Sequence, residues 1–115
     1  MPANDPRPNI LVLMSDQHNR NFMGCAGNDI VRTPNLDRLA SGGTRFTDAY
    51  CGSPICVPSR ASFMTSRLPH NNGVWANGMV LSDALPTWAH VLCAAGYETT
   101  LIGKMHFMGM DQLHG

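Results

Sequence analysis

Residues 51–67 read Cys51-Gly-Ser-Pro-Ile-Cys-Val-Pro-Ser-Arg-Ala-Ser-Phe-Met-Thr-Ser-Arg67, and the rest of the chain is best understood outward from them. Pro58 suits the first turn of a helix, because its missing N–H leaves no intrahelical hydrogen bond unmade there. The stretch therefore predicts a loop that enters a short helix over residues 59–66. We expect Phe63 and Met64 to be buried by this helix.

Two side chains of this stretch can carry chemistry. Cys56 is predicted to lie beside backbone N–H groups at a helix N-terminus, which attract anions. Arg60 adds a fixed positive charge with a planar fork of donors. A reactive side chain, a cation and a helix start together predict chemistry on an oxyanion. Taken alone, however, a single free cysteine is more often a small buried hydrophobic residue.

The same residues resemble a known family signature. Cys56-Val-Pro-Ser-Arg60 followed by Thr65-Ser-Arg67 is similar to the sulfatase pattern C-x-P-S-R…T-G-R. Ser66 departs from it, since the family usually has glycine there. The resemblance implies that a formylglycine-generating maturation enzyme converts Cys56 to Cα-formylglycine, the catalytic aldehyde.

Length and composition bound the remaining possibilities. The chain has 115 residues, 43% of them hydrophobic, which is enough for one small globular domain. Its formal net charge of zero gives no bulk attraction to nucleic acid or to an anionic membrane. The apolar run over residues 10–14 is too short for a signal peptide core or a membrane span, so we expect a cytoplasmic protein. The cysteines lack the spacing of a disulfide framework or a C-x-x-C zinc site.

Alternating strand and helix patterns predict an α/β fold. Three segments are predicted as strands: residues 9–15, 44–50 and 97–102. Two helices are predicted in addition to the one after Cys56: residues 34–41, capped by Thr33, and residues 86–95, ended by Gly96. The first strand is continuously apolar, which is typical of a parallel strand covered on both faces. The resemblance implies the N-terminal part of an alkaline-phosphatase/sulfatase-like sandwich, a mostly parallel central sheet flanked by helices.

Polar residues follow the first predicted strand. Asp16 and Gln17 lie just past its carboxyl end, where open α/β sheets bind ligands, and hard cations prefer oxygen ligands. Considered by position alone, Asp16 is more often a solvated loop carboxylate. The resemblance implies a divalent ion, Ca²⁺ first with Mg²⁺ or Mn²⁺ as alternatives, held by Asp16, Gln17 and position 56.

A second cluster follows the last predicted strand. Lys104 and His106 are two residues apart, so on an extended segment they point to the same side. Taken alone, this pair is as consistent with two solvated side chains as with a binding site. The run from Gly103 to Gly115 resembles the choline-sulfatase branch of the family, which usually has proline where Met110 stands.

Residues 68–83 lie between the Cys51–Arg67 stretch and the segment with Lys104 and His106. They lack clear periodicity and are predicted to form a long surface loop. Asn77 falls where some sulfatases carry an asparagine that contacts the aldehyde, although a turn asparagine is the favoured interpretation. Trp75 is interpreted either as part of a substrate pocket or as ordinary partly buried core.

The resemblance implies the following mechanism. The aldehyde at position 56 is hydrated, and an ion held partly by Asp16 activates one of its hydroxyl groups to attack sulfur. Arg60, Lys104 and the ion stabilise charge on the sulfuryl oxygens. His106 assists departure of the alcohol.

The resemblance covers residues 9–115, after a flexible N-terminus over residues 1–8, and only the N-terminal portion of the family's catalytic domain. We therefore expect residues 1–115 by themselves to be inactive. Three hypotheses remain: a sulfuric ester hydrolase acting on a small sulfate ester such as choline sulfate, a phosphonate monoester or phosphodiester hydrolase, and a non-catalytic product. The oligomeric state is open, with a homo-oligomer of the full-length protein as one alternative.

Overall fold

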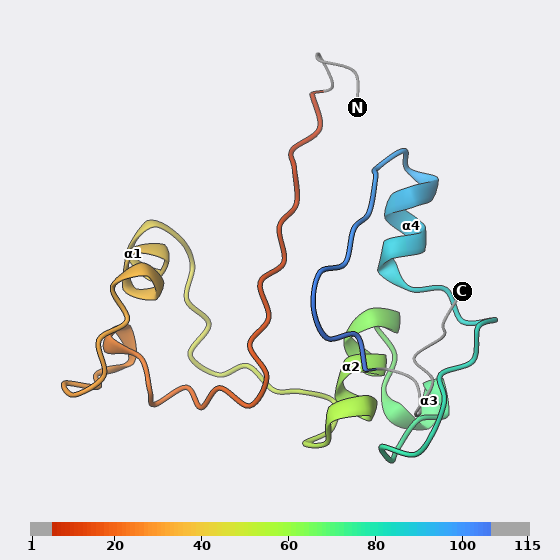
Figure 1. Cartoon of the computed structure of the whole chain (residues 1–115), viewed down its shortest axis with the longest axis horizontal. Helices are drawn as coiled ribbons and strands as arrows, with labels where there is room; N and C mark the ends of the chain where they lie inside the picture. The colour runs from red at the N-terminus through yellow and green to blue at the C-terminus, as the bar shows by residue number, and fades with distance from the viewer. Residues whose placement is uncertain (1–5, 107–115) are drawn as a thin grey trace. The chain divides into compact units, whose positions relative to one another are not determined.

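A computed structural model describes residues 6–106, and the chain divides into two compact units. Residues 6–49 form one unit, and residues 50–106 are the described part of the other (Figure 1). The assignment of residues 9–115 to one portion of a catalytic domain stays a prediction. Within residues 6–106, no helix has the length and apolar character needed to span a membrane.

The three predicted strands are absent from the described residues, which contain helices but no β-strand. Side chains over residues 10–14 are between 47% and 81% exposed, so both faces of this segment are uncovered. A strand needs a neighbouring chain to pair its backbone N–H and C=O groups. Residues 6–106 supply no pairing partner for this segment, so its burial in a sheet stays a prediction.

Unit 6–49 is organised by a short 3₁₀ helix, η1 (Gly24–Ala26), and by α1 (Pro34–Gly42). The prediction of α1 is confirmed, with Thr33 as the N-cap residue. Thr33 does not cap through its side chain, and instead its hydroxyl donates to Asp37 Oδ1 at 3.0 Å. The same carboxylate oxygen accepts from the Cys25 backbone N–H at 2.7 Å, so Asp37 joins η1 to α1.

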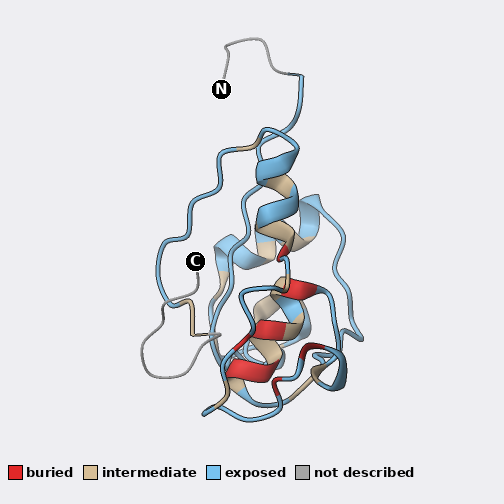
Figure 2. Ribbon diagram, turned by 90° about the vertical axis from the view of Figure 1, so that its right-hand side faces the viewer, coloured by how far each residue is buried: buried red, intermediate tan, exposed pale blue. Residues whose placement is uncertain are grey.

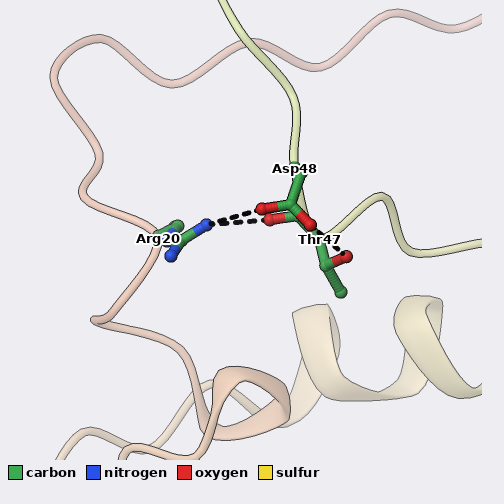
Figure 3. A network of polar contacts seen from close by, with 3 residues as sticks. All are labelled: Arg20, Thr47 and Asp48. Carbon is green, nitrogen blue, oxygen red and sulfur yellow. Dashed lines mark hydrogen bonds and ion pairs between the residues drawn. The ribbon is translucent and has the colours of Figure 1, made fainter.

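A second polar contact in this unit ties together segments far apart in sequence. Arg20 Nη1 donates to the backbone oxygen of Thr47 at 2.8 Å and lies 3.8 Å from Asp48 Oδ1 (Figure 3). The Thr47 hydroxyl also bonds Asp48 Oδ2 at 3.0 Å. Both charged side chains are exposed, so this ion pair contributes little stability.

Unit 50–106 holds three helices: α2 (Cys56–Thr65), α3 (Pro69–Asn72) and α4 (Trp88–Ala94). The helix after Cys56 is confirmed but begins three residues before the predicted start. The prediction of a loop over residues 68–83 was wrong where α3 forms. The last helix begins two residues after Pro86 and is followed by Gly96, whose φ of 83° ends it.

The core of this unit lies along one side of α2. Four fully buried apolar residues form it: Val57, Ala61, Val74 and Leu81. Figure 2 shows the buried residues concentrated on α2 and the chain beside it. The expected burial of Phe63 was wrong, since that ring is 45% exposed, but it packs edge-on against Trp88 of α4 with centroids 5.9 Å apart. Such an aromatic pair contributes about 0.5–1.5 kcal/mol beyond its burial.

Candidate functional site

The first turn of α2 positions Cys56. Ile55 is the N-cap residue in an extended conformation, and its carbonyl accepts the Ser59 N–H at 3.0 Å. Cys56 is therefore the first helical residue, and it is half-buried. Val57 and Pro58 are fully buried behind it, so the backbone of this turn is anchored in the core.

Asn77 holds the same turn from a loop 20 residues downstream. Its side-chain Oδ1 accepts the Val57 backbone N–H at 3.0 Å. Asn77 lies in a turn closed by the Met79 N–H and the Ala76 carbonyl, which confirms the interpretation as a turn residue. The resemblance offered a contact of Asn77 with the aldehyde at position 56, but the bond to the Val57 N–H was not predicted, because nothing in the local sequence indicates which helix a turn asparagine will reach.

Arg60 connects α2, which carries Cys56, to the segment that carries Lys104 and His106. It lies one turn after Cys56, so both residues share a face of α2. Its Nη1 donates to the backbone oxygen of Lys104 at 2.8 Å and to that of Met105 at 3.3 Å. The Met105 side chain packs against the core. The segment carrying Lys104 and His106 is thereby held beside α2.

The predicted geometry of Lys104 and His106 was wrong in one respect. The segment is not a regular extended strand, because Gly103 has a φ of 107° and His106 a φ of 45°. Side chains two residues apart therefore do not alternate as on a strand. Lys104 is exposed, while His106 is half-buried, and its buried Nδ1 has no hydrogen-bond partner among residues 6–106. An unpaired buried ring nitrogen costs free energy that a bound polar ligand could recover.

Asp16 and Gln17 belong to the other unit, residues 6–49, where both are exposed. Gln17 adopts a left-handed backbone with a φ of 57°. Their oxygen atoms suit a hard cation. Over residues 6–106, however, no group of three His, Cys, Asp or Glu side chains is close enough to hold a metal ion. These residues alone do not form a complete metal site, and the roles of Asp16, Gln17 and position 56 as ligands stay predictions.

The run from Gly103 to Gly115 is described only as far as residue 106. The remainder, including Met110, lies outside the described residues, as do residues 1–5 of the predicted N-terminal segment.

Comparison with known proteins identifies relatives over nearly the whole chain. The profile of the sulfatase family matches residues 8–114. The chain is 47% identical to the choline-sulfatase of Rhizobium meliloti (strain 1021) over 109 residues, which cover 95% of this chain and 21% of that protein. It is also 47% identical to human steryl-sulfatase over 116 residues, 91% of this chain and 20% of that protein.

A solved structure matches the fold. It is described as BT4656 in complex with its substrate D-glucosamine-2-N,6-O-disulfate, and it superposes with a TM-score of 0.86 at 38% identity. The match covers 92% of this chain and 22% of that one. The chain thus spans about a fifth of the length of the relatives it matches.

Proposed function

Because the chain belongs to the sulfatase family, we propose that it carries the nucleophile-bearing part of a sulfuric ester hydrolase that cleaves a sulfate monoester. The observation that carries this proposal is the contact between α2 and the segment with Lys104 and His106. Arg60, one turn after Cys56, donates to the backbone of Lys104 and Met105. The residue to be modified, an arginine and the segment with Lys104 and His106 therefore lie in one unit.

Each residue has a distinct task in this proposal. Arg60 carries a delocalised positive charge with several donors, and beyond its bonds to the backbone it neutralises charge on the sulfuryl oxygens. Lys104, an exposed ammonium on the same segment, holds a further sulfuryl oxygen. His106 donates a proton or hydrogen bond to the oxygen of the departing alcohol. Its unpaired buried Nδ1 supports a need for a ligand partner.

A modified residue and a bound ion complete the proposal. A formylglycine at position 56, installed by a maturation enzyme, would supply an oxygen nucleophile that can release sulfate after transfer. The half-buried start of α2 suits it, because an aldehyde is no bulkier than the thiol it replaces. A divalent ion, with Ca²⁺ the first choice, needs ligands in addition to those described here, and we assign no step to it.

Choline sulfate is the proposed first substrate to test. Support comes from the identity of 47% with a choline-sulfatase, and from the run beginning at Gly103 that resembles that branch. A steryl-sulfatase and an N-acetylglucosamine-6-O-sulfatase are also similar to this chain. The choice of choline sulfate therefore concerns which alcohol the sulfate ester carries, and all of these candidates share the sulfate group.

The test is hydrolysis by the intact natural polypeptide, co-expressed with a formylglycine-generating enzyme. Choline sulfate, an aryl sulfate and an aryl phosphonate monoester are assayed side by side. We expect sulfate release from the sulfate esters, and its loss in Cys56→Ala. Cys51→Ala is the matched control, since Cys51 is an exposed cysteine five positions earlier and should leave the rate unchanged. Faster cleavage of the phosphonate would instead favour the phosphonate hydrolase, and no cleavage at all would contradict the proposal.

A further inference from the structure

The segment from Asn72 to Asn77 holds α2 near both of its ends. Asn72 is 5% exposed, and its Nδ2 donates to the Ser62 hydroxyl at 3.3 Å and to the Arg67 carbonyl at 3.1 Å. Its Oδ1 accepts the Val74 N–H at 2.9 Å. Val74 is fully buried in the core with Val57. One end of the segment is thus fixed to the last turn of α2 and to Arg67, two residues past the end of the helix.

The other end of the segment reaches the turn that carries Cys56. The first backbone N–H groups of a helix have no intrahelical partner. In α2, Pro58 has no N–H, Ser59 bonds the Ile55 carbonyl, and Val57 bonds Asn77 Oδ1. The N-cap residue Ile55 makes no capping hydrogen bond with its side chain. Asn77 therefore supplies a cap that the sequence next to the helix does not.

These hydrogen bonds also revise the expectation that backbone N–H groups beside Cys56 form an anion site. With Val57 bonded to Asn77 and Pro58 lacking a donor, Cys56 contributes the remaining N–H of the first three helical residues. Charge on a bound oxyanion must then be met mainly by side chains such as that of Arg60. What the start of α2 supplies is a fixed position for residue 56.

We propose that Asn77 is a positioning residue: by capping Val57, it holds the first turn of α2 so that the side chain at position 56 keeps a fixed orientation toward Arg60. The proposal deepens the proposed function and rests on it for its kinetic consequence. Its structural consequence, a first turn that loosens when the cap is removed, is independent of any activity. Asn77 acts here through the backbone of α2 and not through the substrate.

The test compares Asn77→Ala with Asn77→Asp, which keeps an acceptor oxygen at the same position. Residue-resolved amide exchange should speed up about tenfold at Val57 in N77A, because one hydrogen bond is lost. In N77D it should stay within about threefold of the wild type, since Asn and Asp cap equally well. Asn71→Ala is the matched control, an exposed asparagine of the same region that should leave Val57 exchange unchanged.

Two further readouts separate positioning from substrate contact. In protein that has not been matured, the Cys56 thiol should alkylate faster in N77A than in the wild type, while the exposed Cys51 thiol keeps its rate. In matured protein, N77A should lower kcat about tenfold to a hundredfold with KM within about threefold, as expected for a displaced reacting group.

Unchanged exchange at Val57, an unchanged Cys56 alkylation rate, or a raised KM with unaltered kcat would each overturn the role of Asn77. A wild-type protein without sulfate hydrolysis would contradict the proposed function, while exchange and alkylation would still decide the role of Asn77.

Discussion

Arg60 donates a hydrogen bond from Nη1 to the main-chain oxygen of Lys104 over 2.8 Å, although 44 residues separate them in the chain. The same nitrogen reaches the Met105 oxygen at 3.3 Å. A single guanidinium thus fixes the segment that carries the predicted catalytic residues Lys104 and His106 against the helix that carries the other two, Cys56 and Arg60 itself. Charge and position are coupled in this residue, and substitutions can separate them.

We predict that Arg60→Lys lowers kcat/KM about tenfold to a hundredfold, and that Arg60→Ala lowers it about a hundredfold to a thousandfold. Lysine keeps the charge but lacks the planar guanidinium, whose Nη1 bonds the carbonyls of both Lys104 and Met105. Steady-state hydrolysis of an aryl sulfate by the matured intact protein measures both effects. Arg38→Ala, an exposed arginine of α1, serves as control and should stay within about threefold of the wild type. Full activity in R60K would contradict the positional part of this account.

Ser66 gives a prediction about stability. It ends α2 with φ 56° and ψ 27°, a left-handed conformation, at the position where the family pattern has glycine. That conformation costs a residue with a Cβ about 1–2 kcal/mol, while glycine adds about 0.5–1 kcal/mol of unfolded-state entropy. Ser66→Gly should therefore raise the free energy of unfolding by about 0.5–1 kcal/mol in a denaturant titration.

The control for this prediction is the same substitution inside a helix. Ser41→Gly within α1 should lower the free energy of unfolding by about 0.5 kcal/mol, because glycine is the poorer helix former. Equal effects of the two substitutions would show that the left-handed backbone at Ser66 carries no strain.

Gly24 tests the polar junction of unit 6–49. A Cβ at this position would lie 2.6 Å from Asp37 Oδ2. Gly24→Ala should displace the Asp37 carboxylate, weaken its bond to the Cys25 N–H, and destabilise this unit by about 1–3 kcal/mol. Amide exchange at Cys25 measures the effect. Gly42→Ala is the matched control, because its Cβ meets nothing within 4 Å and alanine favours α1. Equal exchange in both variants would contradict the clash.

We also predict that residues 1–115 by themselves show no turnover of sulfate esters. The reason is that the chain spans about a fifth of the length of the relatives it matches, and further ion ligands are expected from the part of the family's domain that the resemblance does not cover. The measurement is sulfate release after maturation, with Ca²⁺, Mg²⁺ or Mn²⁺ added in turn. Release above that of Cys56→Ala would show that the chain needs no further ligands.

Local signals in the sequence predicted helices well and strands poorly. α1 was located from Thr33-Pro34 and Gly42-Gly43, because caps and stops act within one turn. The segment over residues 10–14 has the composition of a buried strand, but strand pairing requires a neighbour at a distance in sequence. Its apolar pattern could not reveal that residues 6–106 hold no such neighbour.

The candidate site shows the same division. The sequence placed Cys56 in the loop before a helix and Arg60 within that helix, whereas the structure has both residues in α2, which begins three residues earlier than predicted. The Arg60–Lys104 and Asn77–Val57 bonds span 44 and 20 residues, and no local pattern encodes such pairs. His106 was misjudged because a positive φ, which non-glycine residues rarely adopt, breaks the alternation assumed for an extended segment.

The most direct test of the central claim is mass spectrometry of the peptide spanning residues 51–67, taken from protein co-expressed with a formylglycine-generating enzyme. We predict that residue 56 carries the mass of formylglycine, that Cys51 in the same peptide remains a thiol, and that sulfate ester hydrolysis rises with the converted fraction. Hydrolysis that persists with an unmodified thiol at position 56, or complete conversion without any hydrolysis by the intact protein, would contradict it.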